Sequence, residues 1–193
     1  MNANPGTLVS WACFINGYAP WNAGRLAGPL DYAPLFNVSY ERAFLLGTGE
    51  HLATVLLSGE DMAARIESIG GRMSFEPRAM IAHVNIAESG TWLMQRVVAG
   101  RVIASVRSAS WSALRRFAYA ASFPLIPFVL LHRYRSSIAR TIRSNDLPAV
   151  LWLILFTSML FQAFGESLGY LSGRNEKVER RYDTYEIEQI QYA

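Results

Sequence analysis

The stretch LPAVLWLILFTSMLFQAFG, residues 147–165, holds 19 residues without a charged side chain. After Glu166 the apolar character continues through SLGYL. At a helical rise of about 1.5 Å per residue, this run covers the hydrocarbon core of a bilayer, which is about 30 Å thick. We therefore predict a membrane-spanning helix here, with Asn145 or Asp146 as its N-cap and Pro148 in its first turn.

A second apolar run, FAYAASFPLIPFVLL at 117–131, holds only 15 residues and contains Pro124 and Pro127. A helix of that length falls short of the bilayer core, and the prolines interrupt its hydrogen bonding. The run either crosses with help from its flanks, enters and returns, or lies at the interface. We predict a helical membrane segment over 117–173 with one or two crossings.

Arginine dominates the charge beside these runs. No Asp or Glu occurs between Ser89 and Asn145. Nine arginines do occur there: Arg96, Arg101, Arg107, Arg115, Arg116, Arg133, Arg135, Arg140 and Arg143. Because each basic residue near anionic lipid contributes about 1 kcal/mol, we expect the membrane lipid surface to be a partner. Residues 89–116 are predicted to form one or two basic amphipathic helices at that surface, with Ser89 as N-cap, and no nucleic-acid-binding motif surrounds the arginines.

Composition excludes several other kinds of site. The chain of 193 residues carries a net charge of +3 and one cysteine, Cys13, which excludes an intramolecular disulfide and a cysteine-based zinc site. Its start, MNANPGTLVSWACF, lacks the basic beginning and long apolar core of a signal peptide. The tail, 174–193, has mixed charge, and we expect it to be solvated and mobile.

Residues 1–88 show short, mixed patterns instead of long apolar runs. We predict a strand at 8–15, LVSWACFI, and another at 37–40, NVSY. Helices follow at 41–47 and 60–69, and then two extended pieces, RMSFE at 72–76 and AMIAHV at 79–84. In the second helix Met62, Ile66 and Ile69 share one face, and Gly70-Gly71 ends it. This order predicts an α/β half-domain.

Two carboxylates, Glu60 and Asp61, open the second of these helices. Ser58, three residues before Asp61, completes a capping pattern, and the helix dipole stabilises carboxylates in a first turn whatever their function. A carboxylate in that position also stays ionised at neutral pH and can accept a proton from an attacking hydroxyl. The local pattern leaves a helix cap and a catalytic base as alternatives.

The order of small motifs resembles the C-terminal half of family 2 glycosyltransferases, which are inverting enzymes of GT-A fold. The matching strings are NVSYERAFLLGTG (37–49), SGEDMAARIESIGGRMSFEPRAMIAHV (58–84) and GESLGYLSG (165–173), within residues 28–173. We accordingly expect an α/β fold class: a partial, acceptor-side GT-A-like half-domain at 1–88, the basic amphipathic helix at 89–116, the membrane hairpin at 117–173 and the polar tail at 174–193.

The resemblance implies roles for matched residues. Asp61 would be the general base that deprotonates the acceptor hydroxyl, and Glu60 would contact the acceptor or position that base. Asn37 and Ser39 would line the floor of the acceptor site, with a turn or strand-end hydrogen bond as the alternative. His83 matches a histidine that helps coordinate Mg²⁺ or Mn²⁺ at the nucleotide diphosphate, and a strand-end histidine bonded by backbone is the alternative.

Arg96 and Arg101 would lie near a diphosphate or lipid phosphate, and contact with the membrane surface is the simpler interpretation. The sequence departs from the family on the donor side, because no Asp-x-Asp occurs and the 36 residues before NVSY are too few for the nucleotide-binding βαβ units. We therefore expect one of two functions.

The first is a glycosyltransferase, or a fragment of one, that transfers a sugar from a nucleotide sugar to a hydroxyl acceptor with inversion. Its donor half would come from a longer chain or from a partner chain. The second is a non-catalytic membrane protein, either a truncated remnant or an adaptor. We expect an integral membrane location with the motif-bearing half facing the cytoplasm, where nucleotide sugars are made.

Overall fold

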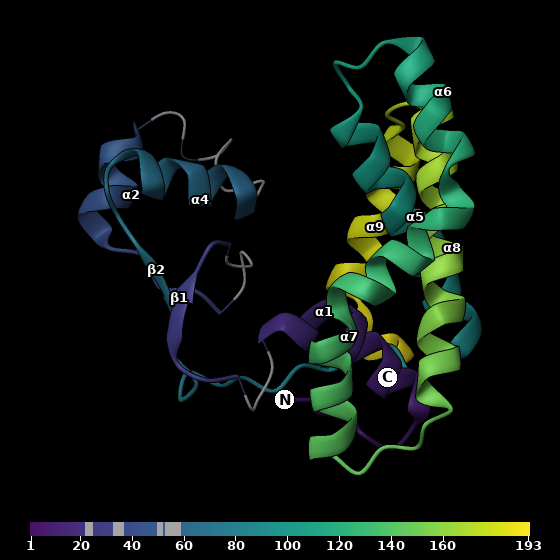
Figure 1. Ribbon diagram of the computed structural model, residues 1–193, viewed down its shortest axis with the longest axis horizontal. Helices are drawn as coiled ribbons and strands as arrows, with labels where there is room; N and C mark the ends of the chain where they lie inside the picture. The colour runs from purple at the N-terminus through teal and green to yellow at the C-terminus, as the bar shows by residue number, and fades with distance from the viewer. Residues whose placement is uncertain (22–24, 33–36, 50–51, 53–58) are drawn as a thin grey trace. The chain divides into compact units, whose positions relative to one another are not determined.

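The computed structural model describes residues 1–21, 25–32, 37–49, 52 and 59–193. Most of the described chain is helical, and its strands form one two-stranded sheet. The chain divides into two compact units. The helical unit comprises Met1–Asn22 and Ala82–Ala193, and the α/β unit comprises Ala23–Ile81 (Figure 1).

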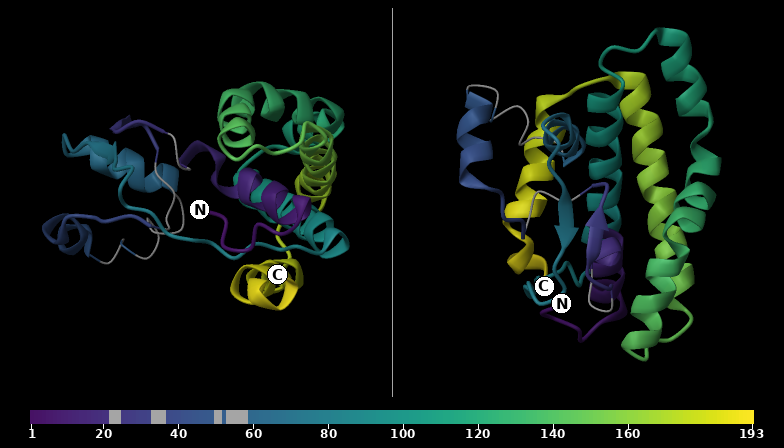
Figure 2. Two further views of the ribbon diagram at one scale, coloured as in Figure 1. Left: turned by 90° about the horizontal axis from the view of Figure 1, so that it is seen from below. Right: turned by 60° about the vertical axis from the view of Figure 1, so that its left-hand side comes forward.

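The helical unit is a bundle in which α5, α7 and α8 run side by side (Figures 1 and 2). Its α-helices are α1 (Leu8–Tyr18), α5 (Ser89–Arg107), α6 (Ala113–Ala121), α7 (Ile126–Ser144), α8 (Leu151–Ser172) and α9 (Glu176–Ile187). Short 3-10 turns, η1 (Ala19–Trp21), η3 (Phe123–Leu125) and η4 (Gln189–Tyr192), connect or end them. The main core gathers residues from α1, α5, α7 and α8, with Trp92 only 2% exposed and Ile15, Leu151 and Leu155 buried.

Helices α5 and α8 approach each other so closely that their backbones touch. A Cβ added at Gly165 would lie 2.1 Å from the carbonyl oxygen of Val97, and one at Gly100 would lie 2.2 Å from that of Gln162. Such distances are possible only where both positions lack a side chain. Residues 89–116 thus form α5 and the start of α6, which is the two-helix alternative, and α5 packs along α8.

Helix α8 confirms the predicted long apolar helix. Among the described residues it is the one helix that is long and apolar enough to cross a membrane, by length and composition. Ala113–Ala121 and Phe123–Ser144, bent by 46° at their break, would add a second span if they act as one. The predicted caps are wrong: Val150 is the N-cap of α8, and Glu88 is the N-cap of α5.

The strand predicted at 8–15 is wrong, because these residues lie in helix α1. Thr7 caps the helix, and its hydroxyl accepts a hydrogen bond from the amide of Ser10 at 3.1 Å. Ala12, Phe14 and Ile15 are buried in the main core. A short, continuous apolar run fits a buried helix as well as a buried strand, so packing against the bundle decides its structure.

The tail differs from the mobile segment we expected. Asn175 caps α9 by accepting hydrogen bonds from the amides of Lys177 and Val178. Tyr185 is buried on this helix, and the amide of Ala87 donates to the carbonyl of Tyr192 at 2.7 Å. The charged residues of the tail therefore form the outer face of a helix that packs on α5.

The α/β unit holds shorter elements: β1 (Gly28–Leu30), α2 (Arg42–Thr48), α4 (Gly59–Ser68) and β2 (Met73–Phe75). The strands are antiparallel over three residue pairs, with Pro29 opposite Ser74. Both predicted helices are confirmed within a residue or two, and RMSFE contains β2. The predicted strand at 37–40 is wrong, and AMIAHV makes only a bridge between His83 and Asn2. This small sheet does not confirm a GT-A-like half-domain.

Candidate functional site

The backbone of Glu60 and Asp61 lies in the first turn of α4, as the sequence predicts. The helix begins at Gly59, directly before the two acidic residues. Amide groups in a first turn have no intrahelical acceptor, so a carboxylate there is favoured in its ionised form. The side chains of Glu60 and Asp61, and the predicted capping residue Ser58, lie outside the described residues.

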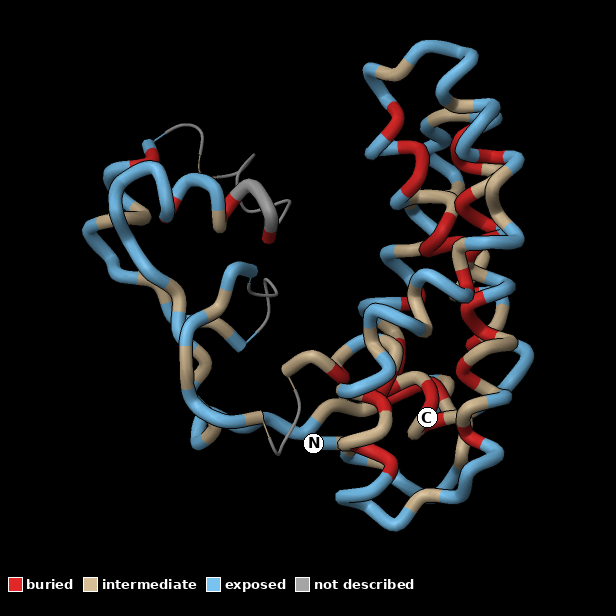
Figure 3. The backbone as a smooth tube through the Cα atoms, viewed as in Figure 1, coloured by how far each residue is buried: buried red, intermediate tan, exposed pale blue. Residues whose placement is uncertain are grey.

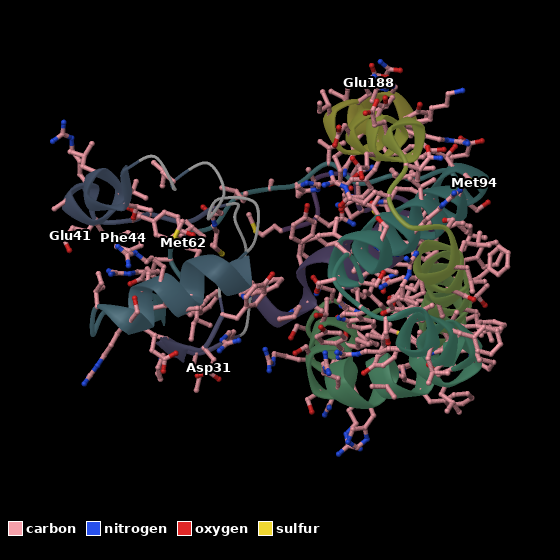
Figure 4. The ribbon with its side chains drawn as sticks, turned by 90° about the horizontal axis from the view of Figure 1, so that it is seen from above. Asp31, Glu41, Phe44, Met62, Met94 and Glu188 are labelled. Atoms are coloured by element: carbon pink, nitrogen blue, oxygen red, sulfur yellow. The ribbon has the colours of Figure 1, made fainter. Side chains whose placement is uncertain are left out.

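One apolar face and a glycine fix the position of α4. Met62 and Ile66 are buried, and Met62 and Phe44 of α2 point toward one another (Figure 4). Ile69, which we predicted as the third member of this face, lies beyond the helix and is exposed. Gly70 has φ of 73°, so the left-handed stop is confirmed.

Asn37 ties the segment before α2 to the segment after β2. Its side-chain amide donates to the carbonyl oxygen of Ala79 at 2.8 Å. Its φ is 50°, a left-handed conformation that asparagine tolerates better than most residues. Asn37 and Ser39 are both exposed. The observed bond of Asn37 joins two positions that are 42 apart in the sequence, so it is a long-range link and differs from the local turn bond that we gave as the alternative.

His83 is fixed through both its backbone and its ring. The backbone amide donates to the carbonyl of Met1, and the carbonyl accepts from the amide of Ala3, both at 2.8 Å. In the half-buried ring, Nε2 lies 2.5 Å from the hydroxyl of Tyr18, and Nδ1 lies 3.2 Å from Oδ1 of Asn85. The structure therefore engages both ring nitrogens with neighbouring side chains.

Burial favours the uncharged forms of the His83 ring and of the Tyr18 phenol. Desolvation lowers the pKa of His83 below its usual value and raises the pKa of Tyr18 above its usual value. Both groups are therefore neutral at neutral pH, and a phenol that donates to Nε2 leaves the ring proton on Nδ1, where it faces Oδ1 of Asn85. A metal ion at Nε2 would have to displace Tyr18, so the ring as arranged does not present a free ligand.

An asparagine network around His83 was not predicted from the sequence. The side-chain amide of Asn85 donates from Nδ2 to Oδ1 of Asn2 at 2.9 Å. Its backbone amide donates to Oδ1 of Asn4 at 2.8 Å. The Ser10 hydroxyl lies 3.1 Å from both Asn2 and Asn4 acceptor oxygens. The one sequence signal was the asparagine-rich start, NANPG, which reads as a turn.

The two arginines assigned to phosphate contact lie at the α5–α8 interface. The guanidinium of Arg96 donates to the side-chain oxygen of Gln162. Arg101 donates to the hydroxyl of Ser172 at 3.2 Å. Further along the same interface, the amide of Gln162 donates to Glu166 at 3.1 Å. Arg96 and Arg101 therefore contact polar groups of α8 in this structure.

A second set of arginines surrounds an aromatic cluster at the C-terminal end of α8. The ring of Trp111 stacks on Tyr170 with centroids 5.6 Å apart, and Tyr119 contacts Tyr170 edge-on at 5.7 Å. The guanidinium of Arg115 lies 4.0 Å from the Trp111 ring centroid. Arg116 donates through Nε to the carbonyl of Tyr170 at 2.7 Å, which satisfies a carbonyl in the last turn of α8. We name Trp111, Tyr119, Tyr170 and Arg115 the aromatic–arginine cluster.

The candidate residues divide between the two units. The α/β unit contains Asn37, Ser39, Glu60 and Asp61, whereas the helical unit contains His83, Arg96 and Arg101. Within the described part of the chain, no group of three or more His, Cys, Asp or Glu residues is placed to hold a metal ion.

The single cysteine offers no nucleophile, since burial raises the pKa of the Cys13 thiol to about 11 and keeps it protonated at neutral pH. No known protein family, no curated protein and no solved structure matches this chain.

Proposed function

We propose that this chain is the acceptor-side portion and membrane anchor of an inverting, family 2 type glycosyltransferase. The observation that carries the proposal is the position of Glu60 and Asp61 in the first turn of α4. The same compact unit contains Asn37 and Ser39, which the resemblance assigns to the acceptor site. The order of motifs and the local helix geometry therefore support one acceptor site within residues 37–79.

In the proposed reaction, Asp61 accepts the proton of the acceptor hydroxyl as its oxygen attacks the anomeric carbon of the sugar. The new carbon–oxygen bond forms while the bond to the diphosphate breaks, and the diphosphate leaves with the electron pair. A single displacement of this kind inverts the anomeric configuration. The N-terminus of α4 favours an ionised base, and general-base catalysis contributes about 10²- to 10⁴-fold to such a rate.

The resemblance also implies Mg²⁺ or Mn²⁺ at the donor diphosphate, with His83 as one ligand. The described residues do not fit this role, because Tyr18 and Asn85 engage both nitrogens of the ring. The proposed mechanism therefore gives His83 no role as a metal ligand. The nucleotide sugar and its metal would be held by a donor half, in a longer chain or in a partner chain.

Helix α8 is the proposed anchor, since its length and composition suit a membrane crossing. We place the motif-bearing α/β unit on the cytoplasmic side, where nucleotide sugars are available. The aromatic and basic residues near the end of α8 are typical of a membrane boundary, where Trp and Tyr gather at headgroup depth. This arrangement would bring a lipid-linked or cell-envelope acceptor to the enzyme.

The test is transfer of labelled sugar in membranes that contain the full-length protein. Asp61→Asn is expected to lower transfer by about 100-fold or more, because it removes the base but keeps the size of the side chain. Glu67→Gln, on the same helix and exposed, is the matched control and should leave transfer unchanged. Unchanged transfer in Asp61→Asn, or an equal loss in the control, would overturn the assignment.

A second candidate function is a non-catalytic adaptor that docks on a complete enzyme. The two-stranded sheet favours it, because its three residue pairs leave each described strand with one edge lacking a strand partner. Such small sheets are marginal alone, and free edges pair readily with another chain. The mass of the endogenous protein in its membrane separates the two ideas. A species of 21.6 kDa that binds no nucleotide, together with unchanged sugar transfer in the Asp61→Asn variant, would favour the adaptor.

A further inference from the structure

Helix α6 and the start of α7 present apolar side chains to the outside. Leu114 is 80% exposed and Phe117 is 64% exposed, and Leu125 and Phe128 are also exposed. Leu114 and Phe117 are three residues apart on α6, and Leu125 and Phe128 continue the exposed apolar stripe beyond the 46° bend, in η3 and the first turn of α7. A soluble surface rarely carries such an ordered apolar stripe.

Helix α8 carries a comparable stripe along its whole length. Leu153, Phe164 and Leu171 are exposed, whereas Leu151 and Leu155 are buried in the core. The exposed residues are spaced by eleven and seven positions, which returns them to one face of the helix. Helix α6 lies beside α8 (Figure 1), and the hydroxyl of Ser167 donates to the carbonyl of Ala120 at 3.0 Å.

The aromatic–arginine cluster lies where these two helices meet the connection from α5. Arg115 is exposed and stacks on Trp111, with its guanidinium carbon 4.0 Å from one ring centroid and 5.8 Å from that of Tyr119. Among the described residues, none accepts a hydrogen bond from the Arg115 guanidinium and none forms an ion pair with it. Stacking on a ring fixes the guanidinium plane and leaves its N–H edge free for a planar anion.

The charges and apolar side chains around Arg115 favour the phosphate of a lipid as its anionic ligand. Residues 89–145 contain no Asp or Glu, and the buried Glu166 carboxylate lies 3.7 Å from Arg107 in an ion pair. A cation next to an apolar stripe, and beside Trp and Tyr rings, fits the boundary between headgroups and acyl chains. Phosphate oxygens match the fork of N–H groups on arginine.

We propose that Arg115, held on Trp111, binds the phosphate headgroup of an anionic phospholipid whose acyl chains lie along the exposed apolar stripe of α6. Leu114, the first residue of the stripe, directly precedes Arg115 in the chain. This site moves the membrane-phosphate contact away from Arg96 and Arg101, which bond to α8 instead. It rests on the membrane attachment in the proposed function and is independent of sugar transfer.

The experiment measures binding of fluorescent phosphatidylglycerol to the full-length protein in a neutral detergent, with fluorescent phosphatidylcholine as the uncharged comparison. Arg115→Gln should weaken phosphatidylglycerol binding about fivefold, the factor expected for one basic residue beside anionic lipid. Arg143→Gln removes an equal charge from another exposed position, in the last turn of α7, and should change binding little. Arg115→Lys keeps the charge but loses the planar stack, so it should fall between wild type and Arg115→Gln.

Several outcomes would overturn the site. Equal losses in Arg115→Gln and Arg143→Gln would show a diffuse charge effect, and equal binding of both lipids would show no headgroup recognition. Displacement by inorganic phosphate at matched concentration would show a free-anion site, and a dimer that excludes lipid would show that a second copy covers the stripe. An unchanged unfolding temperature of Arg115→Gln confirms that the variant is folded. No sugar donor is present, so failure here is distinguishable from failure of the Asp61→Asn test.

Discussion

The contacts inside the helical unit differ in kind from the contacts inside the α/β unit. In the helical unit, side chains from segments far apart in the sequence share one core, and the backbones of α5 and α8 touch at Gly100 and Gly165. In the α/β unit, the sheet has three residue pairs, and α2 and α4 are seven and ten residues long. Figure 3 shows the buried positions concentrated along the helices of the first unit.

From this difference we expect the α/β unit to be the less stable of the two. Isolated helices shorter than about 12–15 residues are marginal in water, and a two-stranded hairpin is marginal as well. The α/β unit therefore relies on a few buried side chains, chiefly Met62 and Ile66, and on the glycine stop after α4. The proposed catalytic base lies in this unit.

The largest effect should come from the core of the helical unit. Trp92→Ala removes a side chain that is 2% exposed and should lower the free energy of unfolding by about 4 kcal/mol. The loss of the helical circular dichroism signal on heating in detergent measures this change in stability. Met62→Ala is the comparison in the α/β unit and should leave the main helical transition unchanged. A shared transition that shifts equally in both variants would show that the two units unfold together.

The next effect tests the backbone contact between α5 and α8. Gly165→Ala places a methyl group 2.1 Å from the carbonyl oxygen of Val97, so the helices must separate, at an expected cost of about 3 kcal/mol. Gly17→Ala in α1 meets no atom within 4 Å and should instead stabilise the helix by up to about 1 kcal/mol. Midpoints of thermal unfolding compare the two. A tolerated Gly165→Ala would contradict the close crossing.

Much of the helical unit could be predicted from apolar length alone. The run at 147–165 predicted α8 because an uncharged stretch of that length has few alternatives to a helix. Helices α2 and α4 were also predicted from local signals, the second from its glycine stop. Helix α1 was mistaken for a strand because its short apolar run has no periodicity that separates the two. Helix α9 was missed because its sequence is mostly charged. The residues that pack, such as Tyr185, are recognised only once α9 lies against α5.

The candidate site could be predicted only at the level of motifs. Sequence order placed Glu60 and Asp61 at the start of a helix, since capping chemistry is local. It could not show that His83 would be engaged by Tyr18, 65 positions away. The sequence also assigned the phosphate contact to Arg96 and Arg101. Sequence alone does not distinguish the arginines of α5 that contact α8 from those that do not. Long-range packing decides which charges remain available.

A smaller effect is expected at the end of α4, in the α/β unit. Gly70 has φ of 73°, where a side chain costs about 1–2 kcal/mol because its Cβ crowds the following carbonyl. Gly70→Ala should therefore loosen the last turn of α4 without changing the helical unit. Faster amide exchange confined to residues 59–70 would show this. Gly90→Ala, at a helical glycine with no atom within 4 Å, is the control and should not raise exchange there.

The smallest effect we expect is a pH dependence from His83, because the causes of its shift oppose one another. Burial lowers its pKa, while the bond to Asn85 and the charge of Glu186 raise it. Since the net pKa in the folded state lies below the unfolded value of about 6.5, the neutral ring stabilises the fold. That stability is fully present above the unfolded pKa and is lost as pH falls through the folded pKa.

The helical unit should therefore melt at a lower temperature at pH 5 than at pH 7.5, and His83→Gln should reduce this difference. His132→Gln, on an exposed part of α7, controls for the loss of a histidine. The N-terminal amine also has a lowered pKa through burial, but it is present in every variant and cancels in the comparison. A pH dependence that His83→Gln leaves intact would place its origin elsewhere and would weaken the case that the Tyr18–His83–Asn85 contact is maintained in solution.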